Sequence, residues 1–155
     1  MKEFNFRLQS VLNLKEQQQD SIQKELMQLH NQYSQVEQQI NNYQQKKINY
    51  LQQLKSKEAE GINLNNMIRY HNYIDHLNQE IEELELKLNY WQEEISKCRE
   101  KLLSKTKEKK VLDKLKDRKH EEYWEDFLRE EQKFNDELAT NSFNRKDSSI
   151  QDFIL

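Results

Sequence analysis

Turn-forming residues are nearly absent from this chain of 155 residues, which contains one glycine and no proline. Because glycine and proline mark most turns in globular domains, the chain has room for few turns and must form few, long elements. No run of alternating β-branched residues bounded by turn residues predicts a strand. The sequence therefore predicts an all-α protein built from long helices.

Apolar residues recur at alternating intervals of four and three residues, which is the spacing of a coiled-coil seam. One series runs from residue 8 to residue 54, and a second runs from residue 67 to residue 112 and resumes between 127 and 138. Near the end of the first series, Ile48 and Leu51 compete with Lys47 and Tyr50 for the seam positions. The interval of eleven residues from Ile40 to Leu51 suggests a local stutter.

The two series lose their rhythm around Gly61, which is followed by Asn63, Asn65 and Asn66. Glycine commonly ends a helix and asparagine is a good N-cap for the next one, so we predict a long antiparallel two-helix coiled-coil hairpin. The alternative is one continuous helix in a parallel dimer, with Gly61 tolerated at a cost of ~1 kcal/mol. The predicted single domain, 1–155, comprises helix one at about 4–57, a turn at about 58–64, helix two at about 65–139, and a flexible tail at 140–155.

Helix two is predicted to overhang helix one, because pairing around Gly61 places residue i opposite about residue 122 minus i. The chain beyond about residue 119 then has no partner helix, yet it carries large apolar side chains. An exposed series of this kind argues for a partner surface. The alternative is that Phe4 and Phe6 fold over part of it. The apolar side chains of the overhang are Tyr123, Trp124, Phe127, Leu128, Phe134 and Leu138.

Charge is segregated along helix two. Residues 97–119 contain eleven Lys or Arg and four acidic residues, whereas residues 120–138 contain eight Asp or Glu and two basic residues. Two solvated faces would explain this pattern, but an acidic, aromatic-bearing end would also be steered toward a basic receptor. The basic run lacks the stacking aromatics of single-strand binders, so no nucleic-acid partner is expected.

No pattern in the chain predicts catalysis, a cofactor or a bound metal. There is no glycine-rich phosphate loop, nucleophile elbow or His-Glu-x-x-His motif, and His71 and His76 are five residues apart, so they do not share a helix face. Cys98 is the only cysteine and occupies a seam position, where a small buried thiol is expected. The absence of an 18-residue apolar run and of a signal-peptide pattern favours a cytoplasmic protein.

Three stretches together resemble the flagellar FliJ export family. They are "FNFRLQSVLNLKE" near the start, "GINLNNMIRYHNYIDHLNQEI" after the turn, and "LDKLKDRKHEEYWEDFLREEQKFNDELA" toward the end. The resemblance implies a non-enzymatic, stalk-like coiled coil of the flagellar type III export apparatus. Such a protein engages the hexameric export ATPase, contacts the export-gate membrane protein and escorts export chaperones. It is cytoplasmic and peripheral at the inner membrane through these partners.

The resemblance also suggests two contact surfaces. Candidate contacts with the ATPase are Phe4, Phe6, Leu8, Tyr123, Trp124, Phe127, Leu128 and Phe134. Candidate contacts with the export gate are Tyr70, Tyr73, Leu77, Glu80 and Leu84, although Leu77 and Leu84 are seam residues that a simple core would also explain. The alternatives are a generic tethering coiled coil that acts as a homodimer, or the equivalent stalk protein of an injectisome.

Overall fold

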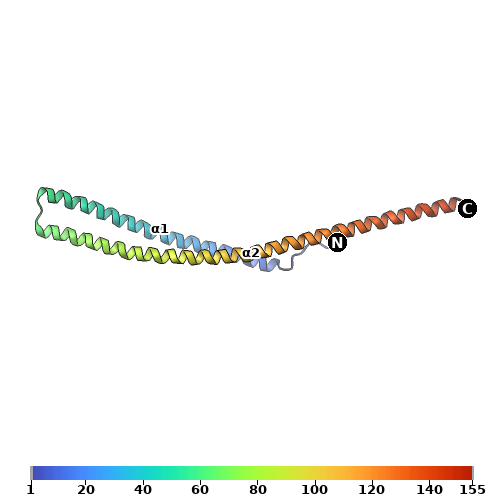
Figure 1. Ribbon diagram of the computed structural model, residues 1–155, viewed down its shortest axis with the longest axis horizontal. Coiled ribbons are helices and arrows are strands. Elements are labelled where there is room, and N and C mark those ends of the chain that lie inside the picture. The colour runs from blue at the N-terminus through green and yellow to red at the C-terminus, as the bar shows by residue number, and fades with distance from the viewer. Residues whose placement is uncertain (1, 155) are drawn as a thin grey trace. The chain divides into compact units, whose positions relative to one another are not determined.

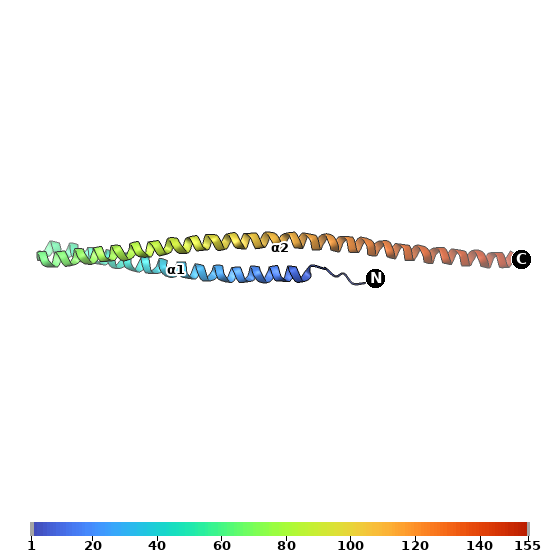
Figure 2. The same ribbon diagram turned by 90° about the horizontal axis from the view of Figure 1, so that it is seen from below.

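The protein folds into two long helices, α1 (Gln9–Glu60) and α2 (Leu64–Ile154), in a computed structural model (Figures 1 and 2). The structure describes residues 2–154, with side chains to residue 149, and contains no strand within that range. The chain divides into two compact units. Gln17–Thr106 forms the hairpin unit, and the residues up to Glu16 form the terminal unit together with the chain from Lys107 onward.

The chain reverses at Gly61, which confirms the antiparallel hairpin. Gly61 has a φ of 93°, a left-handed conformation that glycine adopts without the steric cost of a side chain. Its N–H donates to the carbonyl of Glu58, which closes the last turn of α1. The Asn63 side-chain oxygen accepts a hydrogen bond of 3.2 Å from the N–H of Asn65. Asn63 is therefore the N-cap of α2, as expected for asparagine in this position.

The core of the hairpin unit is a single apolar seam between α1 and α2. Its central cluster contains Val36 and Ile40 from α1 and Ile81 and Leu84 from α2, and Tyr43, Leu88 and Trp91 pack against it. All seven residues belong to the predicted series, so the intervals of four and three residues identified the buried stripe correctly. The helices pack through one layer of side chains, and each helix keeps a broad polar surface.

The structure resolves the competition for the seam near the bend. Tyr50 is half-buried and its ring stacks on that of Tyr73 with the centroids 4.2 Å apart. Ile48 and Leu51 are exposed instead. The seam thus continues through Tyr50 to the buried Leu54 without the predicted stutter. The packing of Tyr50 on Tyr73 fills the space between the helices, so Leu51 is not needed in the seam.

In the terminal unit, the first turns of α1 lie against α2 through polar contacts. Lys15 Nζ is 2.7 Å from Glu108 Oε2, and Lys109 Nζ is 3.6 Å from Glu16 Oε1. The Lys15–Glu108 pair lies within one residue of the pairing predicted around Gly61. The long side chains at these positions cover the seam with their methylene groups, and their charged ends form ion pairs at its edge.

The helix boundaries differ from the predicted ones at both ends of the chain. Helix α1 begins at Gln9 rather than at about residue 4, because the preceding residues form a non-helical segment that packs on α2. Helix α2 continues through 140–154, where a flexible tail was predicted. The sequence alone also allows a small docking hook at Phe153, Ile154 and Leu155, but the side chains of the first two and the whole of Leu155 lie outside the described residues. No described helix is long and apolar enough to cross a membrane.

We predict that Leu77→Ala lowers the free energy of unfolding by about 2–5 kcal/mol, because the substitution leaves a cavity in a seam that has no second layer to close it. Leu77 is 1% exposed. Chemical denaturation followed by circular dichroism measures the change. Leu86→Ala is the matched control, since Leu86 is 70% exposed on the same helix and should change stability by less than about 0.5 kcal/mol. Equal effects of the two substitutions would contradict this assignment of the core.

Candidate functional site

The amino-terminal segment, residues 2–8, lies along α2 in the terminal unit. The Tyr123 hydroxyl donates a hydrogen bond of 2.7 Å to the backbone carbonyl of Lys2. The ring of Phe4 contacts His120 edge-on at 4.9 Å and Tyr123 at 5.6 Å between centroids. Phe6 is buried. The amino terminus therefore covers part of the aromatic segment, and Phe6 belongs to the protein's own core.

An aromatic series continues along α2 beyond this cover. Trp124 Nε1 donates a 3.2 Å hydrogen bond to Nε2 of His120. The ring of Phe127 packs edge-on against Trp124 at 5.4 Å. Trp124 remains 47% exposed. These contacts hold the indole in one orientation without removing it from solvent.

From Leu128 to Ser149, every residue of α2 is exposed. Leu128 and Phe134 are 58% and 60% exposed, and Leu138 and Phe143 are exposed as well. The predicted overhang is therefore present, and its apolar side chains have no cover from the described part of the chain. An exposed apolar series of this kind argues for a partner surface.

A small apolar cavity lies where the amino-terminal segment crosses α2. It has a volume of about 390 Å³. Arg7 and Lys119 add two positive charges to an otherwise mainly apolar lining. The sequence did not reveal this cavity, because it depends on the non-helical path of residues 2–8, which the periodicity of α1 does not predict. It is lined by Phe4, Asn5, Phe6, Arg7, Leu8, Leu115 and Lys119.

The second group of candidate residues lies near the start of α2, in the hairpin unit. Tyr70 and Tyr73 are half-buried against Tyr50. Glu80 is partly exposed, with Oε1 4.0 Å from His76 Nε2. Leu77 and Leu84 are buried in the seam. The two leucines therefore belong to the core beneath this surface. Only Tyr70, Tyr73 and Glu80 of this group are accessible.

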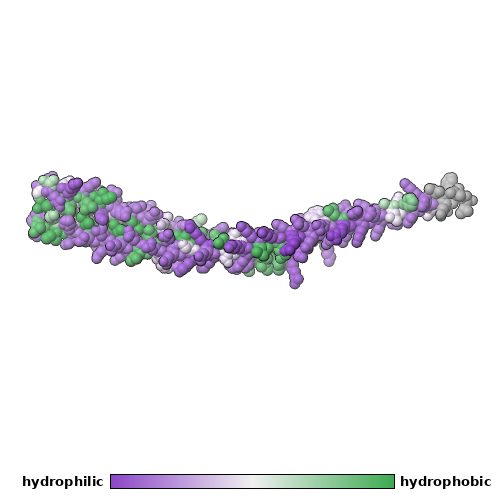
Figure 3. All heavy atoms as spheres, viewed as in Figure 1, coloured by the Kyte–Doolittle hydropathy of each residue, from purple (hydrophilic) through white to green (hydrophobic). Residues whose placement is uncertain are grey.

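A neighbouring apolar patch at the bend was missed by the sequence analysis. Ile48 and Leu51 of α1 and Leu64 and Ile68 of α2 are all exposed. Ile48, Leu51 and Ile68 each follow a seam position by one residue, and in an antiparallel pair such positions lie on the same side of both helices. Leu64 follows the N-cap residue Asn63. Figure 3 shows apolar side chains gathered at this end of the hairpin unit. The signal in the sequence is that Ile48 and Leu51 stand directly after the seam positions Lys47 and Tyr50. This pattern indicates a second apolar surface beside the seam rather than a competition for it.

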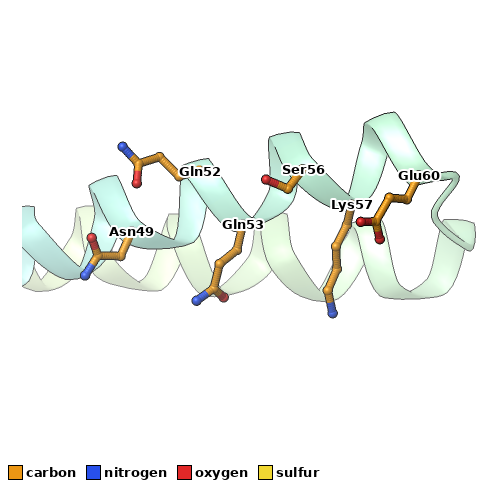
Figure 4. Close-up of a pocket in the computed structure, with 6 residues that line it drawn as sticks. All are labelled: Asn49, Gln52, Gln53, Ser56, Lys57 and Glu60. Atoms are coloured by element: carbon orange, nitrogen blue, oxygen red, sulfur yellow. The ribbon is translucent and has the colours of Figure 1, made fainter.

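The side chains that the sequence analysis considered for metal binding or catalysis can be placed in the structure. No group of three or more His, Cys, Asp or Glu in the described part of the chain is placed to hold a metal ion. A groove at the end of α1 is lined by polar side chains that all come from that one helix (Figure 4). Burial raises the pKa of the Cys98 thiol, with a further increase from Glu25 and an opposing effect of Lys101. The Cys98 Sγ lies 3.7 Å from the carbonyl oxygen of Ile22. A buried thiol with a raised pKa is a poor nucleophile.

The fold defines the class of the protein as an all-α helical hairpin of the coiled-coil type. The family model for the flagellar FliJ protein matches residues 4–148. The chain therefore belongs to the flagellar FliJ family, and it is a protein related to flagellar export. Neither the curated proteins nor the solved structures contain a match to it.

We predict that Phe4→Ala releases the amino-terminal segment from α2, because it removes the ring that packs against both His120 and Tyr123. Hydrogen–deuterium exchange of the amides at residues 2–8 should accelerate several-fold, while exchange in the hairpin unit stays unchanged. Phe143→Ala is the control, since that ring is exposed in the same unit. Unchanged exchange at residues 2–8 in the Phe4 variant would show that the segment is held by other contacts.

Proposed function

We propose that this chain is a stalk-like subunit of the flagellar export apparatus and engages the hexameric export ATPase through the uncovered aromatic part of α2. The observation that supports this most is the exposure of Trp124, Leu128 and Phe134 on a helix without intrachain cover. Full burial of side chains of this size contributes roughly 1.5–3 kcal/mol each. Because the family acts in flagellar export without catalysing a reaction, we take the export ATPase as the partner that covers these exposed side chains.

The electrostatics of the aromatic segment support a basic receptor. Glu121, Glu122, Glu125 and Asp126 surround the aromatic residues. Within the described chain, Lys119 and Arg129 are the cations paired with three of these carboxylates, at distances of 3.3–3.8 Å. Such exposed pairs are weak, so most of the negative field remains available to a partner. That field would accelerate encounter with a positively charged surface on the ATPase.

The double variant Trp124→Ala/Phe127→Ala should weaken binding to the purified flagellar export ATPase by about tenfold or more, because aromatic anchors dominate most interfaces. Binding is measured by titration, and ring assembly and ATPase rate are recorded in parallel. Leu86→Ala/Tyr90→Ala provides the matched control, since it removes exposed apolar groups from the same helix in the hairpin unit. If the two double variants bind equally well, the proposed contact is wrong.

We also propose a second contact, with the export-gate membrane protein, through the accessible residues near the start of α2. Tyr70, Tyr73 and Glu80 are the candidates that remain accessible, and the adjacent exposed Ile68 extends the apolar surface. Aromatic rings with exposed edges above a rigid seam suit a protein partner, because little side-chain entropy is lost on binding. Escort of export chaperones, and peripheral location at the inner membrane through these partners, belong to the same proposal.

Replacing Tyr73 by Ala should reduce binding to the cytoplasmic domain of the export gate by roughly fivefold, in line with the loss of one partly buried aromatic contact. A pull-down or titration with the purified domain provides the measurement, and denaturation checks that the hairpin remains folded. Tyr90→Ala is the control, because Tyr90 is exposed on the same helix away from the bend. Undiminished binding of the Tyr73 variant would place the gate contact elsewhere.

A further inference from the structure

A straight stripe of exposed residues runs along α2 in the terminal unit, on the side that faces away from α1. Its residues are separated by alternating intervals of four and three, which keeps them on one face of the helix. Of the residues between them, those at 108, 109, 112, 113, 115 and 116 are partly covered, and every residue of the stripe is exposed. The stripe consists of Lys107, Val111, Lys114, Arg118, Glu121, Glu125, Leu128 and Gln132.

The stripe has the same spacing in both directions, with its centre between Lys119 and His120. Its chemistry reverses at that centre, since the amino-terminal half is basic and the carboxy-terminal half is acidic. An antiparallel second copy of the stripe would therefore place Val111 opposite Leu128. It would also place Lys114 opposite Glu125 and Arg118 opposite Glu121. Each pairing would occur twice, as in any interface with twofold symmetry.

Within one chain, the charges of this stripe are poorly satisfied. Lys114 and Arg118 are four residues apart, as are Glu121 and Glu125, and like charges at this spacing repel each other on a helix. In the described chain, Lys114, Arg118 and Glu121 form no ion pair, and Glu125 has only Arg129 at 3.8 Å. Val111 is 67% exposed between these cations. A second copy would relieve both repulsions and cover the two apolar side chains.

We propose that two copies of this chain associate through the stripe, with their α2 helices antiparallel. The occupant is a second copy rather than an unrelated acidic helix, because one stripe carries both halves of the complementary pattern in the matching order. The interface contains one apolar pair and two ion pairs in each half. Exposed ion pairs contribute little individually and are screened by salt, so the dimer forms at high protein concentration and low ionic strength.

This dimer and the proposed contact with the ATPase share Glu121, Glu125 and Leu128, but the aromatic anchors Trp124 and Phe127 do not belong to the stripe. The covered ring of Tyr123 and its neighbour Phe127 lie on the side of α2 that continues the seam, whereas the stripe lies on the opposite side. Substitutions in the charged part of the stripe therefore test self-association without removing the aromatic groups. The two proposals fail separately: Trp124→Ala/Phe127→Ala should lose ATPase binding while the dimer persists, and Lys114→Glu/Arg118→Glu should lose the dimer while the aromatic residues of the ATPase contact remain.

Sedimentation equilibrium of the full-length chain tests the proposal. We expect a reversible monomer–dimer equilibrium whose dissociation constant rises by about tenfold or more between ~0.02 M and ~0.5 M salt, because screening is nearly complete at the higher value. The variants Lys114→Glu/Arg118→Glu and Glu121→Lys/Glu125→Lys should each be monomeric. An equimolar mixture of these two variants should form a heterodimer, since one half of the interface then has its charge pairs in reversed sense and the other half keeps the original pairs.

Cysteine crosslinking determines the direction of the helices. In the antiparallel dimer, the position of Val111→Cys on one copy lies opposite that of Leu128→Cys on the other, so a mixture of the two variants should form the mixed disulfide under mild oxidation. In a dimer of the Val111→Cys variant alone, the two introduced thiols would be separated by roughly 26 Å along the helix, so this variant should not crosslink to itself. The unmodified chain serves as the control because Cys98 is buried.

Each of three results would overturn the proposal. The first is a chain that stays monomeric at low salt and high concentration. The second is a dimer that persists in both charge-reversed variants, which would place the interface elsewhere. The third is a disulfide between two copies of the Val111→Cys variant, which indicates parallel helices. Circular dichroism of every variant must match the unmodified chain, because the substituted positions are exposed and should not alter the fold.

Discussion

The reversal of the chain at Gly61 determines which residues of the two helices meet. With a single left-handed turn between them, α1 and α2 run antiparallel, and every later contact is set by distance from that turn. Cys98 reaches the carbonyl of Ile22 and Lys15 reaches Glu108 because both pairs are nearly equidistant from Gly61. An added Cβ at Gly61 would have nothing within 4 Å. The requirement for glycine is therefore a matter of backbone conformation and not of space.

The position of this turn in the chain leaves two helices of unequal length. Because α1 contains 52 residues and α2 contains 91, part of α2 lies beyond any pairing with α1, and the amino-terminal segment covers only its first aromatic residues. The seam can end at Tyr123 because that ring is capped by Phe4 and by a hydrogen bond to Lys2. Apolar side chains past this point are exposed, and we propose that they and the segregated charges of α2 contact other molecules.

The hairpin and most of its core could be predicted from the sequence, because a seam with intervals of four and three residues depends only on local periodicity. The choice between Tyr50 and Leu51 could not be predicted, since it depends on Tyr73, a residue from the other helix. The start of α1 at Gln9 was missed for a similar reason: the stability of the preceding non-helical segment comes from His120 and Tyr123, which are distant in sequence. The charged stripe was overlooked because a search for apolar periodicity does not register a periodic pattern of charges.

The uncovered part of α2 has a consequence for how it can be recognised. Starting a helix is the costly step of helix formation, whereas adding residues to an existing helix is nearly neutral in free energy. In this chain the starting step is accomplished inside the hairpin, where α2 is held by its seam. The backbone near Phe134 is therefore already helical before a partner binds there. Because binding then requires little ordering of the peptide backbone, contacts with the side chains determine both the affinity and the selectivity of the partner.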